Sequence, residues 1–279
     1  MKRTLVFVML SGLLAGCAGK MTVIGQDIIA TGYPATQAKW TQRGSGGYSS
    51  LVFRDLTYLA ESSESVWDTA PMLVLDPGAA DLYYDEFGDF VGNAAAWTIT
   101  ETDAAATEAT SQSRPTSLYV ANTATDNDGV EIQLLGEGFK LASGKPLWFE
   151  ARIQCNDATQ SDLIVGLCIT DTSLITAMSD GVTFRKHDGD ANIDFVTEKN
   201  STETSADTGV DLVASTWIKL GFWFNGSGTV TPYVNGVAKT AHTTNICDDE
   251  ELTVSIAVQN GEGAAKNLSV DYVRVLQVR

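Results

Sequence analysis

The stretch that decides the fold runs from Trp217 to Val237 and reads W-I-K-L-G-F-W-F-N-G-S-G-T-V-T-P-Y-V-N-G-V. Its first part, up to Phe224, is rich in aromatic and branched apolar residues, which are typical of a strand. The Asn-Gly-Ser-Gly that follows predicts a turn, because Asn and Gly tolerate the positive φ angles that hairpins need. A second strand then ends at another Asn-Gly pair, at 235–236. The stretch therefore predicts consecutive antiparallel strands, to which neighbours can add on both sides.

The same pattern continues from Leu82 to the end of the chain, where short strand-like runs alternate with turn residues such as Asp, Asn, Ser and Gly. The predicted strands cover 83–87, 97–101, 117–121, 130–135, 146–155, 163–170, 181–186, 193–198, 217–224, 230–234, 252–259 and 268–276. About a dozen short strands without long helical periods between them predict an all-β sandwich or barrel. A parallel α/β sheet is excluded, because such a sheet needs helices between its strands.

The chain of 279 residues is acidic, with a net charge of −17. Residues 1–80 hold six basic and six acidic residues and are neutral overall. Residues 81–279 hold the other 12 basic and 29 acidic residues and carry the whole net charge. An acidic body of this kind repels phosphate backbones, which argues against nucleic-acid binding.

The first twenty residues, MKRTLVFVMLSGLLAGCAGK, resemble an export leader. A basic pair precedes an apolar run, and Leu14-Ala15-Gly16-Cys17 resembles the lipobox of bacterial lipoproteins. One interpretation is cleavage before Cys17 and lipid attachment to its sulfur, which would tether the protein to a membrane. The apolar run could instead be an uncleaved arm that packs on a partner, or translation could start at Met21. All three alternatives stay open at this point.

Residues 21–82 lack the clear strand pattern of the later chain. The segment 48–60 fits either a strand or an amphipathic helix, and 72–75 is long enough for one buried strand. We interpret this part as a linker or docking arm. The predicted domains are therefore a leader or arm at 1–20, a linker or docking arm at 21–82 and a sandwich at 83–279.

From about Tyr83 onward the chain resembles the concanavalin A-like and laminin-G-like jelly-roll modules. The motifs that carry this likeness are P-L-W-F-E-A-R-I (146–153), W-I-K-L-G-F-W-F with Y-V-N-G (217–224 and 233–236) and L-S-V-D-Y-V-R-V (268–275). Three further stretches resemble modules of uncharacterised tailed-phage virion proteins: S-D-L-I-V-G-L-C-I-T-D-T (161–172), F-R-K-H-D-G-D-A-N-I-D-F-V-T-E-K (184–199) and A-V-Q-N-G-E-G-A-A-K (257–266). The resemblance covers about two thirds of the chain and implies an antiparallel jelly-roll β-sandwich behind an N-terminal arm.

Glycoside hydrolases of the laminarinase type share this fold and carry a strand motif E-x-D-x-x-E. Retaining hydrolysis needs two carboxyl groups about 5 Å apart. The strand L-I-V-G-L-C-I-T, which follows W-F-E-A-R-I-Q, holds no acid. Asp194 and Glu198, the nearest acidic pair within one strand, lie roughly 13 Å apart along it. We interpret both as solvated strand residues, assign no catalytic residue and predict that the protein is not an enzyme.

Laminin-G-like modules often bind calcium at a rim, and hard cations prefer oxygen ligands. Asp188, Asp190 and Asn192 offer oxygens at alternating positions and are the predicted calcium ligands, with a weaker cluster at 126–128. Neither cluster completes an EF-hand loop, and Asp and Asn are also common turn residues. We interpret the acidic run 248–251 as a solvated loop.

Other metal or nucleophile chemistry has few residues to draw on. The two histidines, His187 and His242, offer little for a His-rich metal site or a Ser-His-Asp relay. Cys155, Cys168 and Cys247 fit no zinc motif, and buried thiols are favoured over a disulfide among them.

Glycan binding in this fold uses exposed aromatic side chains and polar loop tips, for which Trp223 and Tyr233 are candidates. Strand aromatics more often belong to the core, and the same holds for Trp97 and Trp148. Two functions are carried forward. The first is a non-enzymatic phage virion protein, such as a capsid decoration or other head-surface component, whose arm docks on capsid or other virion proteins and which forms homo-oligomers. The second is a bacterial cell-envelope lipoprotein whose sandwich binds glycan.

Overall fold

The structure of the chain is a computed structural model. It describes residues 80–90, 94–102, 106–111 and 116–279 with their side chains, and the backbone of four earlier strands. These early strands form two antiparallel pairs: β1 (Lys20–Ile24) with β2 (Asp27–Thr31), and β3 (Ala38–Arg43) with β4 (Tyr48–Phe53). The segment from Tyr48 therefore begins as a strand. Cys17 and the predicted strand at 72–75 lie outside the described residues.

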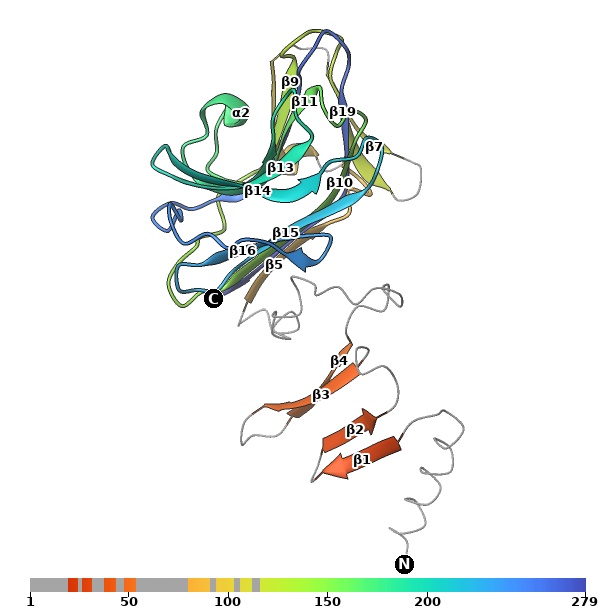
Figure 1. Cartoon of the computed structure of the whole chain (residues 1–279), viewed down its shortest axis with the longest axis vertical. Coiled ribbons are helices and arrows are strands. Elements are labelled where there is room, and N and C mark those ends of the chain that lie inside the picture. Colours follow the sequence, from red (N-terminus) through yellow and green to blue (C-terminus); the bar gives the residue numbers. More distant parts are fainter. Residues whose placement is uncertain are drawn as a thin grey trace, which may run out of the picture. The chain divides into compact units, whose positions relative to one another are not determined.

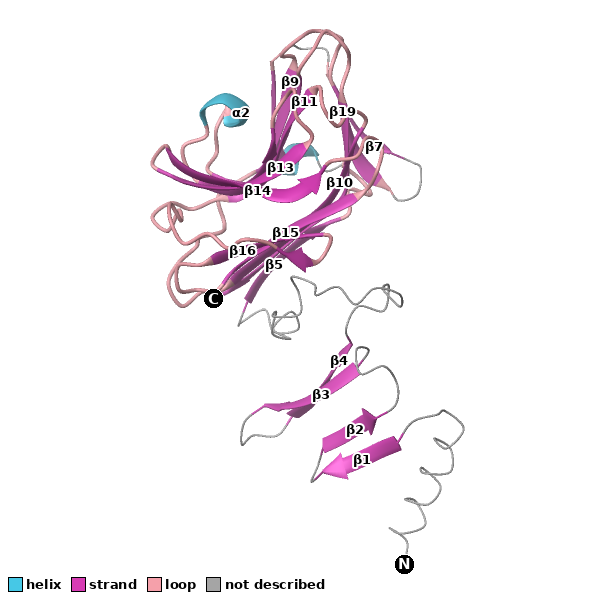
Figure 2. Cartoon of the chain, viewed as in Figure 1, coloured by secondary structure: helices cyan, strands magenta, loops and turns pink. Residues whose placement is uncertain are grey.

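The chain divides into two compact units, 1–62 and 63–279. The second unit is a sandwich of two antiparallel sheets (Figures 1 and 2). The eight-stranded sheet has the order β17-β16-β15-β10-β19-β8-β7, and β5 also pairs with β19. Its strands are β5 (Ala80–Asp85), β7 (Thr107–Ser111), β8 (Ser117–Ala121), β10 (Leu147–Cys155), β15 (Ile218–Phe224), β16 (Val230–Val234), β17 (Val237–Ala238) and β19 (Asn267–Val278).

The seven-stranded sheet has the order β14-β13-β12-β11-β18-β9-β6. Its strands are β6 (Trp97–Glu101), β9 (Gly129–Leu134), β11 (Ser161–Cys168), β12 (Gly181–Lys186), β13 (Asn192–Lys199), β14 (Thr202–Asp211) and β18 (Thr253–Asn260). The short helix α2 (Leu174–Ala177) lies on the inside of this sheet's curve, on the side away from β10, β15 and β16 (Figure 1). A short 3₁₀ turn, η3 (Ala94–Ala96), precedes β6.

The predicted fold class is confirmed, since the described chain is nearly all β and its strands pair antiparallel in two sheets. Four predicted strands have the observed bounds, namely those at 97–101, 117–121, 181–186 and 230–234. The strands β7 and β14 were not among those predicted. No helix in the described ranges has the length and apolar character to cross a membrane.

The hairpin of β15 and β16 forms as the sequence predicts. The side-chain oxygen of Asn225 accepts hydrogen bonds from the N–H groups of Ser227 at 2.7 Å and Thr229 at 3.1 Å. Gly226 and Gly228 adopt φ angles of +75° and +85°, which only glycine reaches without strain. The turn thus sets the register in which Leu220 opposes Val234.

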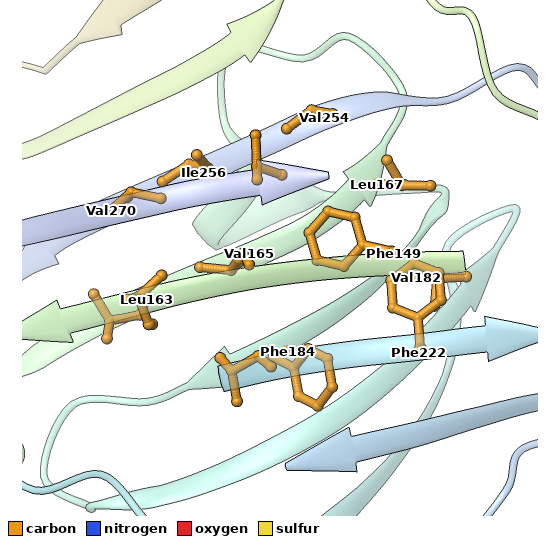
Figure 3. Packing of buried hydrophobic residues seen from close by; sticks show 14 of the residues in the cluster. Phe149, Leu163, Val165, Leu167, Val182, Phe184, Phe222, Val254, Ile256 and Val270 are labelled. Atoms are coloured by element: carbon orange, nitrogen blue, oxygen red, sulfur yellow. The ribbon is translucent and has the colours of Figure 1, made fainter. Parts of the chain in front are cut away.

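The core lies between the two sheets, where side chains from both inner faces interdigitate (Figure 3). Phe149 of β10 stacks on Phe222 of β15 with ring centroids 4.9 Å apart. Phe195 of β13 packs against Phe222 from the opposite sheet, and their ring centroids lie 6.1 Å apart. Each such buried side chain contributes about 1.5–3 kcal/mol to stability. Cys155, Cys168 and Cys247 are buried free thiols, as expected.

Candidate functional site

The face of the seven-stranded sheet that is turned away from the eight-stranded sheet, called here the outer face, collects charged residues. Along β13 the core residues Ile193 and Phe195 alternate with Asp194, Val196 and Glu198, which therefore point outward. The strand register places Asp194 opposite Asp207 of β14, and Glu198 opposite Glu203. We call these four carboxylates the acidic strip. Like charges directly opposite each other across two strands are destabilising, so this face carries a cost in stability.

One arginine lies among the four carboxylates. Arg185 of β12 stands opposite Asp194 in the register, and its guanidinium reaches across β13. Its Nη1 atom lies 2.5 Å from Oε2 of Glu203, and its Nη2 atom lies 3.5 Å from Oε2 of Glu198. The Arg185 side chain is only 11% exposed, so the ion pair with Glu198 is largely removed from water. The strip and its arginine together have a formal charge of −3.

Burial raises the pKa of two of these acids. Desolvation raises the pKa of Glu198, and the negative charge of Glu203 adds to the shift while Arg185 opposes it. Desolvation also raises the pKa of Asp194, with the charge of Asp207 as the next cause. The interpretation of Asp194 and Glu198 as two solvated strand residues was wrong for Glu198, which is buried and paired. The cause is the arrangement of neighbouring strands, which spacing within one strand does not reveal.

The middle of the outer face is covered by residues 169–180, called here the cover segment, which contains α2. Its side chains Leu174 and Met178 are buried against a patch of apolar residues from β11, β13 and β18, namely Ile164, Cys168, Val196 and Ala257. The N–H of Asp171 donates to Gln133 of β9 at 2.9 Å, and the same glutamine donates to the carbonyl of Ile169 at 2.9 Å. The cover segment thus closes the central strands and leaves the acidic strip at the β14 edge open.

Several buried polar atoms on the outer face have no hydrogen-bond partner. These atoms are Oε2 of Glu131, Oγ1 of Thr183, Nε of Arg185 and Oε2 of Glu198. Buried polar groups are nearly always hydrogen-bonded in folded proteins, and exceptions call for a water, an ion or a ligand. Three of these atoms, those of Thr183, Arg185 and Glu198, lie on β12 and β13 in or next to the acidic strip, whereas Glu131 lies on β9. The part of the outer face over β12 and β13 is therefore the candidate site.

Of the predicted calcium ligands, Asp188 and Asp190 lie in the loop between β12 and β13, and Asn192 is the first residue of β13. Both carboxylate oxygens of Asp190 accept hydrogen bonds from Asn192, one from its N–H and one from its side-chain amide, each at 3.0 Å. The carboxylate of Asp188 lies against Gly261, where an added Cβ would come within 1.9 Å of it. The loop therefore brings Asp190 and Asn192 together, while Asp188 faces the turn after β18. In the second cluster, Asp128 accepts a hydrogen bond from the N–H of Thr123 at 3.0 Å.

Another group of metal-ligating side chains was not predicted. Asp180, Cys247 and Asp249 place one ligand atom each within 4.8 Å of the others. Burial raises the pKa of the Cys247 thiol to about 12, so the thiol remains protonated at neutral pH. The carboxylate of Asp180 already accepts from the N–H of Asn200 at 2.8 Å and from Ser179 at 3.0 Å. The carboxylate of Asp180 therefore already has hydrogen-bond partners within the chain.

The aromatic candidates are mostly buried. Trp97 belongs to the main core, whereas Trp148 and Tyr233 form a separate buried cluster with Ala80 and Leu276. Trp223 is half-buried against this cluster and stacks on Trp148 with centroids 6.5 Å apart. The expectation that strand aromatics belong to packed cores is confirmed for Trp97, Trp148 and Tyr233.

Two curved antiparallel sheets that pack face to face define a concanavalin A-like β-sandwich. Within this class, the chain belongs to the family described as SO2946-like, C-terminal domain, which matches residues 113–260. The crystal structure of SO2946 from Shewanella oneidensis MR-1, titled a protein of unknown function, is similar. It has 14% sequence identity and a TM-score of 0.51 over 72% of this chain and 87% of that one. No curated protein matches the chain.

Two glucanases also share the fold. The β-glucanase of Bacillus licheniformis has 14% identity and a TM-score of 0.51, over 70% of this chain and 97% of that one. The GH16 enzyme of the Bacteroides ovatus mixed-linkage glucan locus, solved with a G4G4G3G product, has 12% identity and a TM-score of 0.51. That match covers 69% of this chain and 99% of the enzyme. The prediction that the protein is not an enzyme is corrected by these structures, because its fold is one that glycoside hydrolases use. The likeness at this identity is one of fold.

Proposed function

We propose that the sandwich binds carbohydrate at the open part of the outer face, around the acidic strip and Arg185. The observation that carries the proposal is the strand register of β13 and β14, which sets Asp194 opposite Asp207 and Glu198 opposite Glu203. An arrangement that costs stability persists where it serves a function. A related fold provides support, since the Bacteroides ovatus enzyme was solved with a glucan product.

The chemistry of the strip suits sugar hydroxyl groups. Each hydroxyl both donates and accepts, and each carboxylate accepts through two oxygens. The guanidinium of Arg185 supplies donors beside these acceptors, and charge-assisted hydrogen bonds of this kind are stronger than neutral ones.

The cover segment sets the size of the ligand. Leu174 and Met178 fill the outer face over β11 and β18, so a polysaccharide cannot cross the whole sheet. The open area over β12, β13 and β14 suits a short oligosaccharide or the end of a longer chain.

Calorimetric titration of the full chain with mixed-linkage β-glucan oligosaccharides tests this proposal. The variants Asp194→Asn and Asp207→Asn should bind about tenfold more weakly, which corresponds to about 1.4 kcal/mol. Asp81→Asn, which removes an exposed acid of β5 paired with Arg279, is the matched control and should bind like the parent chain. Equal affinity in all variants would refute the site. Assaying the same mixtures for new reducing ends shows whether bound glucan is also cleaved.

We also propose a setting for this binding, namely the surface of a tailed-phage particle, as a capsid decoration or other head-surface component. The support is the resemblance of 161–172, 184–199 and 257–266 to virion modules, together with the charge of −17 carried by 81–279. An acidic body stays soluble and avoids packaged nucleic acid. The test is whether the protein copurifies with particles at a stoichiometric copy number.

The alternative setting is the bacterial cell envelope, with the chain tethered through Cys17. Intact mass separates the two settings. A lipidated Cys17 at a new N-terminus supports the envelope lipoprotein, whereas a chain that begins at Met1 or Met21 excludes it.

A further inference from the structure

The outer face carries more negative than positive charge. Four carboxylates face one guanidinium, and Arg185 is the only cation in the described part of the chain that forms an ion pair with any of the four. The neighbouring basic residues have other partners: Lys199 pairs with Asp248 and Asp249, and Lys186 donates to the backbone carbonyls of Thr159 and Ser161. His187 lies near enough to Asp194 to lower its pKa, but its ring pairs with Asp162. The strip therefore keeps an uncompensated negative charge.

Buried polar atoms next to the strip point to an absent partner. Thr183 of β12 is fully buried, and its Oγ1 atom has no hydrogen-bond partner. The register places Thr183 opposite Val196, which stands between Asp194 and Glu198 along β13. The side chain of Glu198 is 9% exposed, and its Oε2 atom has an ion-pair contact with Nη2 of Arg185 at 3.5 Å but no hydrogen bond. The Thr183 hydroxyl is an observation separate from the charge, and both oxygens have lone pairs that can accept a hydrogen bond.

An ammonium group meets both requirements, because it carries positive charge and offers three donors with no acceptor. Building on the proposed function, we propose that the outer face selects glycans with free amino groups, such as oligosaccharides of glucosamine. N-acetylation removes the charge of the amine, and uronic or sulfated sugars bring a charge of the wrong sign. Both modifications should therefore weaken binding at the acidic strip.

The test compares three tetrasaccharides of similar length on the full chain: tetraglucosamine, its N-acetylated form and cellotetraose. Dissociation constants are measured at low salt and at about 0.15 M ionic strength, where charges further apart than about 8 Å are screened. Tetraglucosamine should bind at least about tenfold more tightly than the other two at low salt, and its advantage should shrink as salt is added. Glu203→Gln and Asp207→Asn, which alter exposed positions of β14, should each reduce that advantage, whereas Asp81→Asn should preserve it.

The outcomes separate the two proposals. If cellotetraose binds as tightly as tetraglucosamine and the β14 variants weaken both, the carbohydrate site stands and the amine selectivity is refuted. If tetraglucosamine binds but the β14 variants and Asp81→Asn weaken it equally, general attraction to the acidic body explains the binding and the selectivity of the strip is refuted. If no oligosaccharide binds, both proposals fail.

Discussion

The contact between Asp194 and Asp207 makes a direct prediction about stability. Directly opposite residues of an antiparallel pair have Cβ atoms about 5 Å apart, where two unit charges repel by about 0.8 kcal/mol in water and about 3 kcal/mol at an effective dielectric constant near 20. Asp207 is exposed and Asp194 is half-buried, so the repulsion lies near the lower figure. Asp207→Asn should therefore stabilise the sandwich by about 0.5–1 kcal/mol, which raises Tm by about 1–4 °C for a domain of this size.

Urea unfolding of the parent chain, both single variants and the double variant Asp194→Asn/Asp207→Asn isolates the pairwise energy. Asp211→Asn is the matched control, because it removes an exposed acid from the same strand opposite the neutral Asn192. The control should leave stability unchanged within about 0.5 kcal/mol. A loss of stability in Asp207→Asn, or a coupling energy of zero in the cycle, would refute the argument that the two carboxylates repel each other.

The same pair has a defined pH dependence. The pKa of Asp194 is raised in the folded protein, so the folded state binds a proton that the unfolded state has already released. The contribution of Asp194 to the free energy of unfolding therefore rises as pH falls from neutral through the pKa of the folded state. It levels off below the pKa of the unfolded state. The increase in stability caused by Asp207→Asn should become smaller over the same pH range, because a protonated Asp194 no longer repels Asp207. A gain that is constant with pH would contradict this reasoning.

Three other predictions concern the packing of the seven-stranded sheet and the predicted calcium ligands. Gly166→Ala should destabilise the sheet by at least about 1–3 kcal/mol, because the new Cβ would lie 2.2 Å from the carbonyl oxygen of Val182, whereas Gly138→Ala meets nothing within 4 Å and is the control in urea unfolding. Leu174→Ala should cost about 2–4 kcal/mol by opening a cavity under the cover segment, and the exposed Leu135→Ala should cost little; equal effects would mean that the segment is not packed. Millimolar calcium should raise Tm and EDTA should lower it if Asp188, Asp190 and Asn192 bind the ion, and Asp190→Asn should abolish the shift.

Most of the sandwich could be predicted because its strands carry strong local signals. The runs that became β10, β15 and β18 are apolar and bounded by Asn, Asp and Gly, and these signals act within a few residues of each other. The cover segment was not predicted, since α2 has only four residues and its Leu174 could equally belong to a strand. Its position depends on a contact with Val196 and Ala257, which are distant in sequence.

The candidate site was not predicted for a related reason, which concerns the sequence of β14. Its sequence, T-E-T-S-A-D-T-G-V-D, has almost no apolar residue and no hydrophobic alternation, so nothing local identifies it as a strand. It forms because β13 offers a ready edge, and Thr204 and Thr208 keep β-branched side chains that suit a pleated surface. Glu203 and Asp207 become site residues only when that pairing sets them opposite Glu198 and Asp194. A carboxylate pair that spans two strands is invisible to a search within one strand, so the prediction that excluded enzymes had considered only part of the acids on this face. The useful signal in such a chain is therefore an acidic, Thr-rich stretch directly after a strand whose own outward positions are acidic.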